Sequence, residues 1–243
     1  MNRTHRAAWG VALAAWMTAG CATTPMGPAL SHDETQVYRA DYFDWPRLKS
    51  GGLGMLGVTS TVAPEGIRED VAFVLDQAAS NYLTKVRVVL HGDAAVRARE
   101  VGMSEDLSRL LRHYESRGAM DAGLLRRLAS AEGVRYFLVA RIARYERTMR
   151  DQAGPATVVV TPGLGAPKRT AERVQRIRLV GEVWDSRCGN IVWSGEGGTE
   201  AVEESVTEDV RLQDVLSMAA TNLVSLLPRP GDATRAVEKE CGA

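Results

Sequence analysis

The sequence predicts an α/β domain in which a mixed sheet of about five strands carries packed helices. In the first half of the chain, apolar residues at steps of three and four, typical of helices, alternate with short apolar runs typical of strands. The second half contains three strand patterns in succession and ends in one helix pattern. That order is typical of helices packed on a mixed sheet. With 243 residues and 25% charged side chains, the chain has the size and composition of one globular domain.

The first half supplies two short strands and most of the helices. The apolar run 53–58 predicts a buried strand, and the residues from Pro64 to Tyr82 follow as a helix with one apolar face. Ser104 and Asp121 are the expected N-caps of two later helices. The other elements expected here are a strand at 86–90 and helices at 93–101, 104–118 and 121–133.

The second half predicts antiparallel strands with one buried and one solvated face. Strands are expected at 134–147, 174–184 and 191–195, followed by a helix at 212–226. Within the middle strand, apolar and charged residues alternate, so the two sets point to opposite faces. The expected inward set is Ile177, Leu179, Gly181 and Val183, and the expected outward set is Arg176, Arg178 and Glu182.

The N-terminus has the pattern of a secretory signal. Residues 1–20 begin with two arginines, continue with an uncharged stretch too short to span a bilayer, and end in small residues before Cys21. This resembles a bacterial lipobox, which predicts a lipid on Cys21; an ordinary signal peptide with a chance cysteine is the alternative. The expected organisation is a signal peptide at 1–20, a tether at 21–36, the domain at 37–228 and a tail at 229–243.

The charge and the rare residues argue against several functions. Lys+Arg and Asp+Glu both number 30, so no basic field for nucleic acid is expected. Three cysteines and four scattered histidines predict no metal, and no other cofactor is expected. No nucleophile elbow, P-loop or H-E-x-x-H motif occurs, so we expect no enzyme activity. Five acidic residues in and after the last strand patterns are expected on a solvated sheet edge or in a loop: Asp185, Glu196, Glu200, Glu203 and Glu204.

Three further features have two interpretations each. Gly52, Gly54 and Gly57 match G-x-G-x-x-G, but they lie inside a strand pattern, which favours close packing over a dinucleotide site. Cys188 and Cys241 are expected to form a disulfide outside the cytoplasm; two free thiols are the alternative. Trp184 and Trp193 are expected to pack in the core or on a sheet face rather than to stack on a ligand.

The connection at 148–172 is longer than a hairpin needs. It combines a short apolar stretch with two cations, which is the composition of a contact patch. We expect it to contact a partner and to contribute little to the fold; a disordered insertion is the alternative. The residues expected to contact a partner are Val158, Val159, Val160, Leu164, Lys168 and Arg169.

The second half of the chain also resembles a known family. The segments 133–142 (GVRYFLVARI) and 177–194 are similar to a strand and a hairpin of the curli-secretion lipoprotein family (CsgG-type). Asp185 and Gly189 match the hairpin pattern, and Cys188 stands where that pattern usually has Thr. The family is related to the penicillin-binding-protein activator LpoB and to the TolB N-terminal domain. The resemblance implies a CsgG/TolB-N-like sandwich that is periplasmic and lipid-tethered.

These observations lead to one expected function and one alternative. We expect an outer-membrane lipoprotein that faces the periplasm and acts as a binding module: a regulator, adaptor or assembly factor of an envelope machine. Its expected partners are the membrane, through the lipid, and an envelope protein that the sequence does not identify. Assembly of several copies into a homo-oligomer is a further alternative. The alternative, implied by one branch of the family, is a ring-forming outer-membrane secretion pore of curli type.

Overall fold

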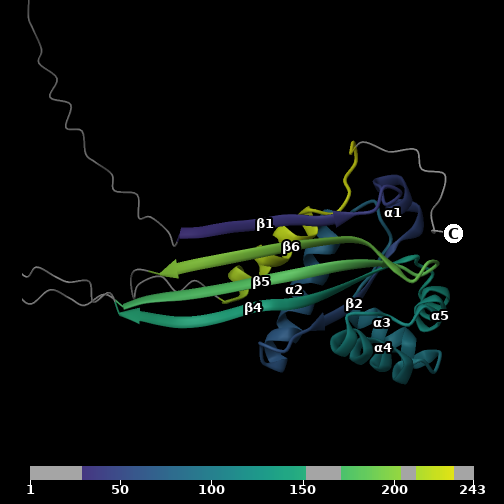
Figure 1. Ribbon diagram of the computed structural model, residues 1–243, viewed down its shortest axis with the longest axis horizontal. Coiled ribbons are helices and arrows are strands. Elements are labelled where there is room, and N and C mark those ends of the chain that lie inside the picture. The colour runs from purple at the N-terminus through teal and green to yellow at the C-terminus, as the bar shows by residue number, and fades with distance from the viewer. Residues whose placement is uncertain (1–28, 152–170, 204–211, 233–243) are drawn as a thin grey trace, which may run out of the picture.

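A six-stranded mixed sheet forms the centre of the protein (Figure 1). The computed structural model describes residues 29–151, 171–203 and 212–232. The strand order is β1-β6-β5-β4-β2-β3; β2 runs parallel to β3 and β4, and the other pairs are antiparallel. The elements are β1 (Ala29–Arg39), α1 (Trp45–Gly51), β2 (Leu53–Thr59), α2 (Glu65–Tyr82), β3 (Val88–Val89), α3 (His91–Glu100), α4 (Ser104–Arg117), α5 (Ala122–Glu132), β4 (Tyr136–Asp151), β5 (Ala171–Asp185), β6 (Asn190–Glu203) and α6 (Leu212–Ser225).

Two cores lie on opposite faces of the sheet, which confirms the predicted α/β class. The larger core contains side chains of α1, α2 and α6 and the inward residues of the strands, with Trp193 fully buried. The smaller core joins α3, α4 and α5 to the other face of β2 and β4. Alternate residues of β4 therefore serve different cores: Leu138 belongs to the first, and Phe137 and Val139 to the second.

Strand β1 and helix α1 differ from the sequence prediction. The domain start expected at 37 is wrong, because residues from Ala29 onward pair with β6. This polar segment shows no apolar alternation; its backbone hydrogen bonds to β6 place it in the sheet. Helix α1 is capped by Asp44, whose Oδ1 accepts from the Arg47 backbone N–H at 3.0 Å. The sheet has six strands rather than about five because β1 joins it.

The last three strands are longer than the sequence predicts. Strand β6 continues past 195 to Glu203 because it pairs with β5 on one side and with β1 on the other. Strand β4 ends at Asp151 and β5 begins at Ala171, so both ends of the connection predicted at 148–172 are paired strand. Helix α6 packs closely on these strands. Asn222 donates from Nδ2 to the Gly198 carbonyl at 2.8 Å, which ties α6 to β6.

The glycine motif in β2 has a packing role, as expected. An added Cβ at Gly54 would lie 2.7 Å from the Phe137 ring, and one at Gly57 would lie 2.8 Å from the His91 ring. Gly57 also has a φ of 113°, which side chains other than glycine rarely adopt. These glycines let β2 approach its neighbours closely, and no helix begins at the motif.

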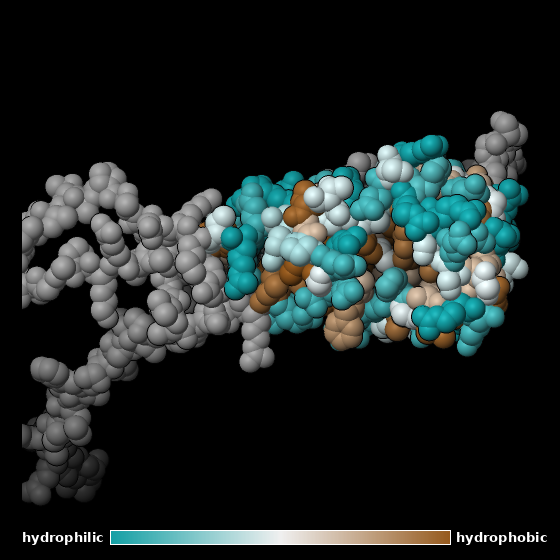
Figure 2. Space-filling view, turned by 90° about the horizontal axis from the view of Figure 1, so that it is seen from below, coloured by the Kyte–Doolittle hydropathy of each residue, from teal (hydrophilic) through white to brown (hydrophobic). Residues whose placement is uncertain are grey.

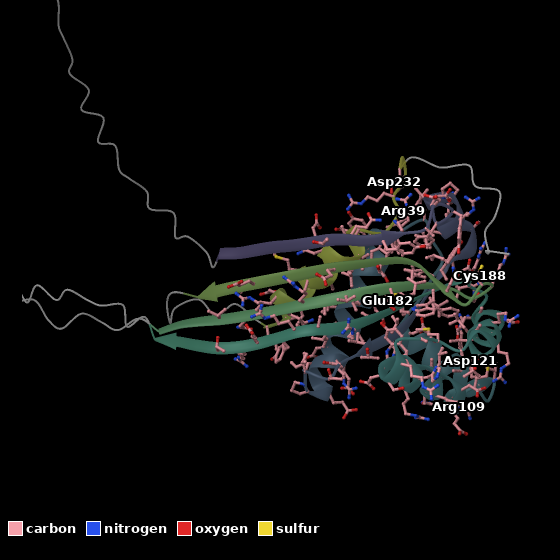
Figure 3. All side chains as sticks on the ribbon, in the orientation of Figure 1. Arg39, Arg109, Asp121, Glu182, Cys188 and Asp232 are labelled. Atoms are coloured by element: carbon pink, nitrogen blue, oxygen red, sulfur yellow. The ribbon has the colours of Figure 1, made fainter. Side chains whose placement is uncertain are left out.

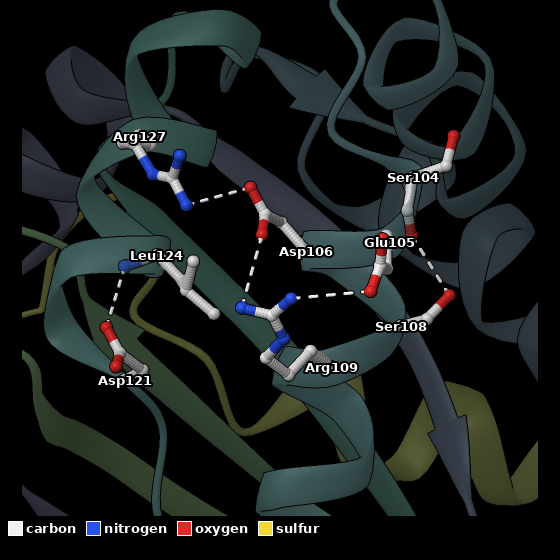
Figure 4. Close-up of polar contacts among 8 residues, drawn as sticks. All are labelled: Ser104, Glu105, Asp106, Ser108, Arg109, Asp121, Leu124 and Arg127. Carbon is white, nitrogen blue, oxygen red and sulfur yellow. Dashed lines mark hydrogen bonds and ion pairs between the residues drawn. The ribbon is translucent and has the colours of Figure 1, made fainter.

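Helices α4 and α5 are joined by a small polar network (Figure 4). Asp106 on α4 lies between Arg127 of α5, at 2.8 Å, and Arg109, at 3.9 Å. Asp121 caps α5 as predicted, accepting from the Leu124 backbone N–H at 2.8 Å, and this hydrogen bond lowers the pKa of the Asp121 carboxyl. Ser104 is the first residue of α4 rather than its cap, and its backbone carbonyl accepts from Ser108.

Glu132, at the end of α5, is fully buried and weakly partnered. Its carboxylate oxygens accept no hydrogen bond among the described residues, and the nearest cation, Arg97 Nε, lies at 3.8 Å. Burial raises the pKa of this carboxyl; Arg97 and Arg87 lower it by less, and Asp93 raises it further. The ionised form is therefore disfavoured in the folded state.

The Glu132→Gln variant is expected to be at least as stable as the parent at pH 7. When the pKa of a carboxyl is higher in the folded than in the unfolded state, the group does not lower the free energy of unfolding at pH values below the unfolded pKa. The free energy of unfolding falls as pH rises through the folded pKa. The parent should gain stability from this site as pH falls from 7 towards 4.5, and the variant should lose that part of the pH dependence. Urea unfolding at several pH values measures both; a variant less stable than the parent across this range would contradict the assignment.

Candidate interaction surface

One face of the extended strands is not covered by helices among the described residues. Helices α2 and α6 lie behind the sheet in Figure 1, and α3–α5 cover the opposite face only near β2 and one end of β4 and β5. The alternation predicted for β5 is confirmed: Ile177, Leu179 and Val183 are buried, and Arg176, Arg178 and Glu182 are partly exposed on the uncovered face. We call this surface the open face.

Charged residues on three neighbouring strands form a ladder across the open face. Arg176 lies opposite Glu146 of β4 and Glu200 of β6 in the strand register, and it pairs with both, at 3.2 and 2.5 Å. Arg144 pairs with Glu146 at 2.7 Å, and Arg178 lies 3.9 Å from Glu196. Directly opposed strand positions bring side chains close enough to interact, so the register itself builds the two pairs of Arg176. We call these six residues the charged ladder.

The ion pairs of the ladder favour the charged forms of Glu146 and Arg176. The hydrogen bond from Arg144 lowers the pKa of Glu146, and Arg176 lowers it further. The hydrogen bond to Glu200 raises the pKa of the Arg176 guanidinium beyond its already high value. Glu146 and Arg176 therefore stay charged throughout the physiological pH range.

A shallow hollow interrupts the ladder on β6. Gly198 stands opposite Arg178 and has no side chain, so the surface is lower there than at Glu196 and Glu200 on either side. The hollow has a volume of about 330 Å³. Its lining includes the charged side chains of Arg144, Arg176, Arg178 and Glu200. A partner side chain entering it would meet fixed guanidinium and carboxylate groups.

The open face ends at a polar contact with α4. The indole Nε1 of Trp184 donates to Glu182 Oε2 at 3.3 Å, and the Tyr114 ring meets Trp184 edge-on, with ring centroids 6.4 Å apart. Burial raises the pKa of Tyr114 far above its usual value, and Glu182 adds to this. Trp184 and Trp193 are both buried, which confirms core packing for each.

The exposed apolar residues do not form a competing surface in the view of Figure 2. That view, from below, shows apolar residues separated by hydrophilic ones. Single exposed apolar residues are normal on a protein surface. The large apolar residues with the most exposed side chains are Val62, Phe73, Val96 and Val101.

Three of the five acidic residues, Asp185, Glu196 and Glu200, lie elsewhere than predicted. Glu196 and Glu200 belong to an interior strand with neighbours on both sides, so the prediction of an edge or loop is wrong for them. Asp185 is fully buried and binds Arg135 through two hydrogen bonds from Nε and Nη2, the shorter at 2.6 Å. Glu203 ends β6, and Glu204 lies outside the described residues. Periodicity marked the outward residues of β5, but their partners on β4 and β6 follow only from the register.

Most of the predicted site residues lie outside the described part of the chain. These are Cys21, Cys241 and the six residues of the predicted contact patch, Val158, Val159, Val160, Leu164, Lys168 and Arg169. Cys188 lies in the β5–β6 turn beside α5 (Figure 3), with its Sγ 3.7 Å from Asp185 Oδ2. The pairing of Cys188 with Cys241 therefore stays a prediction.

The described residues contain no group of three or more His, Cys, Asp or Glu side chains placed to hold a metal ion. None of the described helices is long and apolar enough to cross a membrane.

The chain is similar to several solved bacterial structures at low sequence identity. A PelC dodecamer from Paraburkholderia phytofirmans is 11% identical, covering 83% of this chain and 100% of that one, with a TM-score of 0.43. Lipoprotein GNA1162 from Neisseria meningitidis is 14% identical, covering 72% and 98%, with a TM-score of 0.42. The LpoB C-terminal domain from Salmonella enterica is 13% identical, covering 61% and 82%, with a TM-score of 0.33. No protein-family model and no curated protein matches the chain.

Proposed function

We propose that the protein is a lipid-anchored outer-membrane lipoprotein that faces the periplasm and acts by binding an envelope protein rather than by catalysis. The charged ladder on the open face is the observation that carries the proposal. Its six side chains are set on three hydrogen-bonded strands, so their spacing is fixed before any partner arrives. The signal-like residues 1–20 and Cys21 support the anchor.

The ladder suits recognition because its charges are ordered but still accessible. The side chains of Arg144 and Arg178 are 46% and 41% exposed, so a partner carboxylate reaches them without opening the fold. Charged rows of this kind contribute orientation and partner selection more than raw affinity. A regulator, adaptor or assembly factor requires those properties.

Site-specific crosslinking in cells tests the binding surface. A photo-crosslinking residue at Arg144, on the open face, is expected to capture one protein species of defined mass. The same residue at Ser80, exposed on α2, serves as the control and is expected to capture none. Equal capture from the two positions, or none from Arg144 in a correctly folded and exported protein, would count against the open face.

Cys21→Ser is expected to abolish incorporation of a fatty-acid label and to release the protein from the membrane fraction. Several acyl chains give stable anchoring, and without them no described helix spans the bilayer. Labelling and fractionation of cells producing parent and variant measure this effect. A variant that still takes up label would end the lipoprotein proposal.

A ring-forming pore component of curli type is the second candidate. The observation that favours it is the length of the β4–β5 pairing, which runs from Tyr136–Asp185 to Asp151–Ala171. Closed rings are a common form of homo-oligomer. The mass of the lipidated protein in mild detergent separates the two candidates, since a ring gives a large discrete assembly and a binding module a monomer or small oligomer. The implied kinship with the curli-secretion family stays part of this proposal.

A further inference from the structure

Four strands begin or end at the same end of the sheet. Strand β1 begins at Ala29, which pairs with Val202 of β6, and β6 ends one residue later. At the same end, Asp151 of β4 pairs with Ala171 of β5. We call this the strand end, defined by Ala29, Asp151, Ala171 and Glu203. Figure 1 shows it at the left, and α3, α4 and α5 at the opposite end.

The chain between the proposed lipid and the strand end is short. Residues 22–28 join Cys21 to Ala29, and seven residues span at most about 25 Å when fully extended. The eleven residues of β1 alone extend about 35 Å. The connection to the lipid is therefore shorter than the domain that it holds.

This geometry favours one orientation at a membrane. The domain is elongated and is attached at one end by a link shorter than its own length. It cannot turn its far end toward the bilayer, because the attached end would then have to lie farther from the membrane than the link allows. The remaining orientations keep the attached end near the surface and exclude those in which the opposite end alone faces the bilayer.

We propose that the strand end faces the bilayer, which keeps the charged ladder close to the membrane surface and within reach of a protein held in the same membrane. The proposal rests on the lipid anchor at Cys21 proposed above. Glu200 lies three residues from the strand end and Arg176 five, about 10 and 17 Å along the strands. With the link fully extended, all six ladder residues remain within about 50 Å of the membrane surface. A partner held in the opposite membrane would have to cross the periplasm to reach it.

Energy transfer from the protein to the membrane tests the orientation. The full-length lipidated protein is reconstituted into phosphatidylethanolamine–phosphatidylglycerol vesicles that carry an acceptor dye on the lipid head groups. A donor dye is attached through an azide-bearing residue at Thr148, exposed near the strand end, or at Ser130, exposed on α5. An azide label leaves Cys188 untouched. Transfer from Thr148 is expected to be several-fold stronger than from Ser130.

Two variants separate the orientation from the anchor. A Gly/Ser segment of about 30 residues inserted between Thr24 and Pro25 adds an average span of about 30 Å, so the difference between the two positions should shrink. Cys21→Ser should remove vesicle binding and with it transfer from both positions. Equal transfer, or stronger transfer from Ser130, in a protein that remains bound through Cys21 overturns the orientation and leaves the lipid anchor intact. A parent protein that fails to bind vesicles overturns the anchor itself.

Discussion

Replacing Arg135 with leucine is expected to lower the free energy of unfolding by about 3–5 kcal/mol, the usual cost of removing one partner of a buried ion pair. Asp185 has no exposed surface, and Arg135 supplies it with two charge-assisted hydrogen bonds. In the variant the carboxylate keeps the backbone N–H of Arg187, at 3.0 Å, but loses its counter-ion. The contact of the guanidinium with the Tyr136 ring is lost too.

Urea unfolding of Arg135→Leu beside Arg127→Ala measures this effect against a matched control. Arg127 also pairs with a carboxylate, Asp106, at 2.8 Å, but its side chain is 59% exposed. Exposed pairs contribute about 0–1 kcal/mol, so the control should change stability little. Equal losses for the two variants would show that burial does not set the strength of the Arg135–Asp185 pair.

Replacing Gly197 with alanine is expected to destabilise the protein by about 3 kcal/mol, at the upper end of the range for overpacking. An added Cβ would lie 2.7 Å from Leu223 Cα and 2.8 Å from the Ala219 carbonyl oxygen, both backbone atoms of α6. A side chain could rotate away, but a helix backbone must shift as a whole, and α6 is held by the Asn222 hydrogen bond to Gly198.

Gly66→Ala is the control for this substitution. Gly66 lies in the first turn of α2, and an added Cβ meets nothing within 4 Å. Alanine is the better helix former, by up to about 1 kcal/mol, so this variant should be as stable as the parent or more stable. Thermal unfolding followed by circular dichroism compares the two; similar midpoints would show that α6 does not press on β6 as described.

Local patterns in the sequence were sufficient for the elements that bury a regular apolar face. The helix expected at 64–82 is observed as Glu65–Tyr82, and the one expected at 212–226 as Leu212–Ser225. The Asp121 cap is a local hydrogen bond three residues along the chain, so the sequence contains both partners. Burial periodicity and capping are properties of neighbouring residues, and they can be read without knowing the fold.

Elements stabilised by distant partners could not be predicted in this way. Most of β1 carries polar residues and enters the sheet only because β6, more than 150 residues later, offers its hydrogen-bonding edge. The continuation of β6 past 195 depends on the same pairing. The charged ladder depends on two strand registers at once, so the sequence showed the arginines of β5 without showing the glutamates that they meet.

The pairing of β1 also determines how the domain would carry a load. A pull from a lipid at Cys21 enters the domain at Ala29 and runs along the axis of β1. Because antiparallel hydrogen bonds lie perpendicular to the strands, such a pull shears the β1–β6 bonds together rather than unzipping them one after another. The ion pair between Arg39 and Asp232, at 3.2 Å, lies at the far end of the same strand (Figure 3). If Cys21 carries the proposed lipid, the strand that receives the pull is therefore set in a geometry that resists detachment by force.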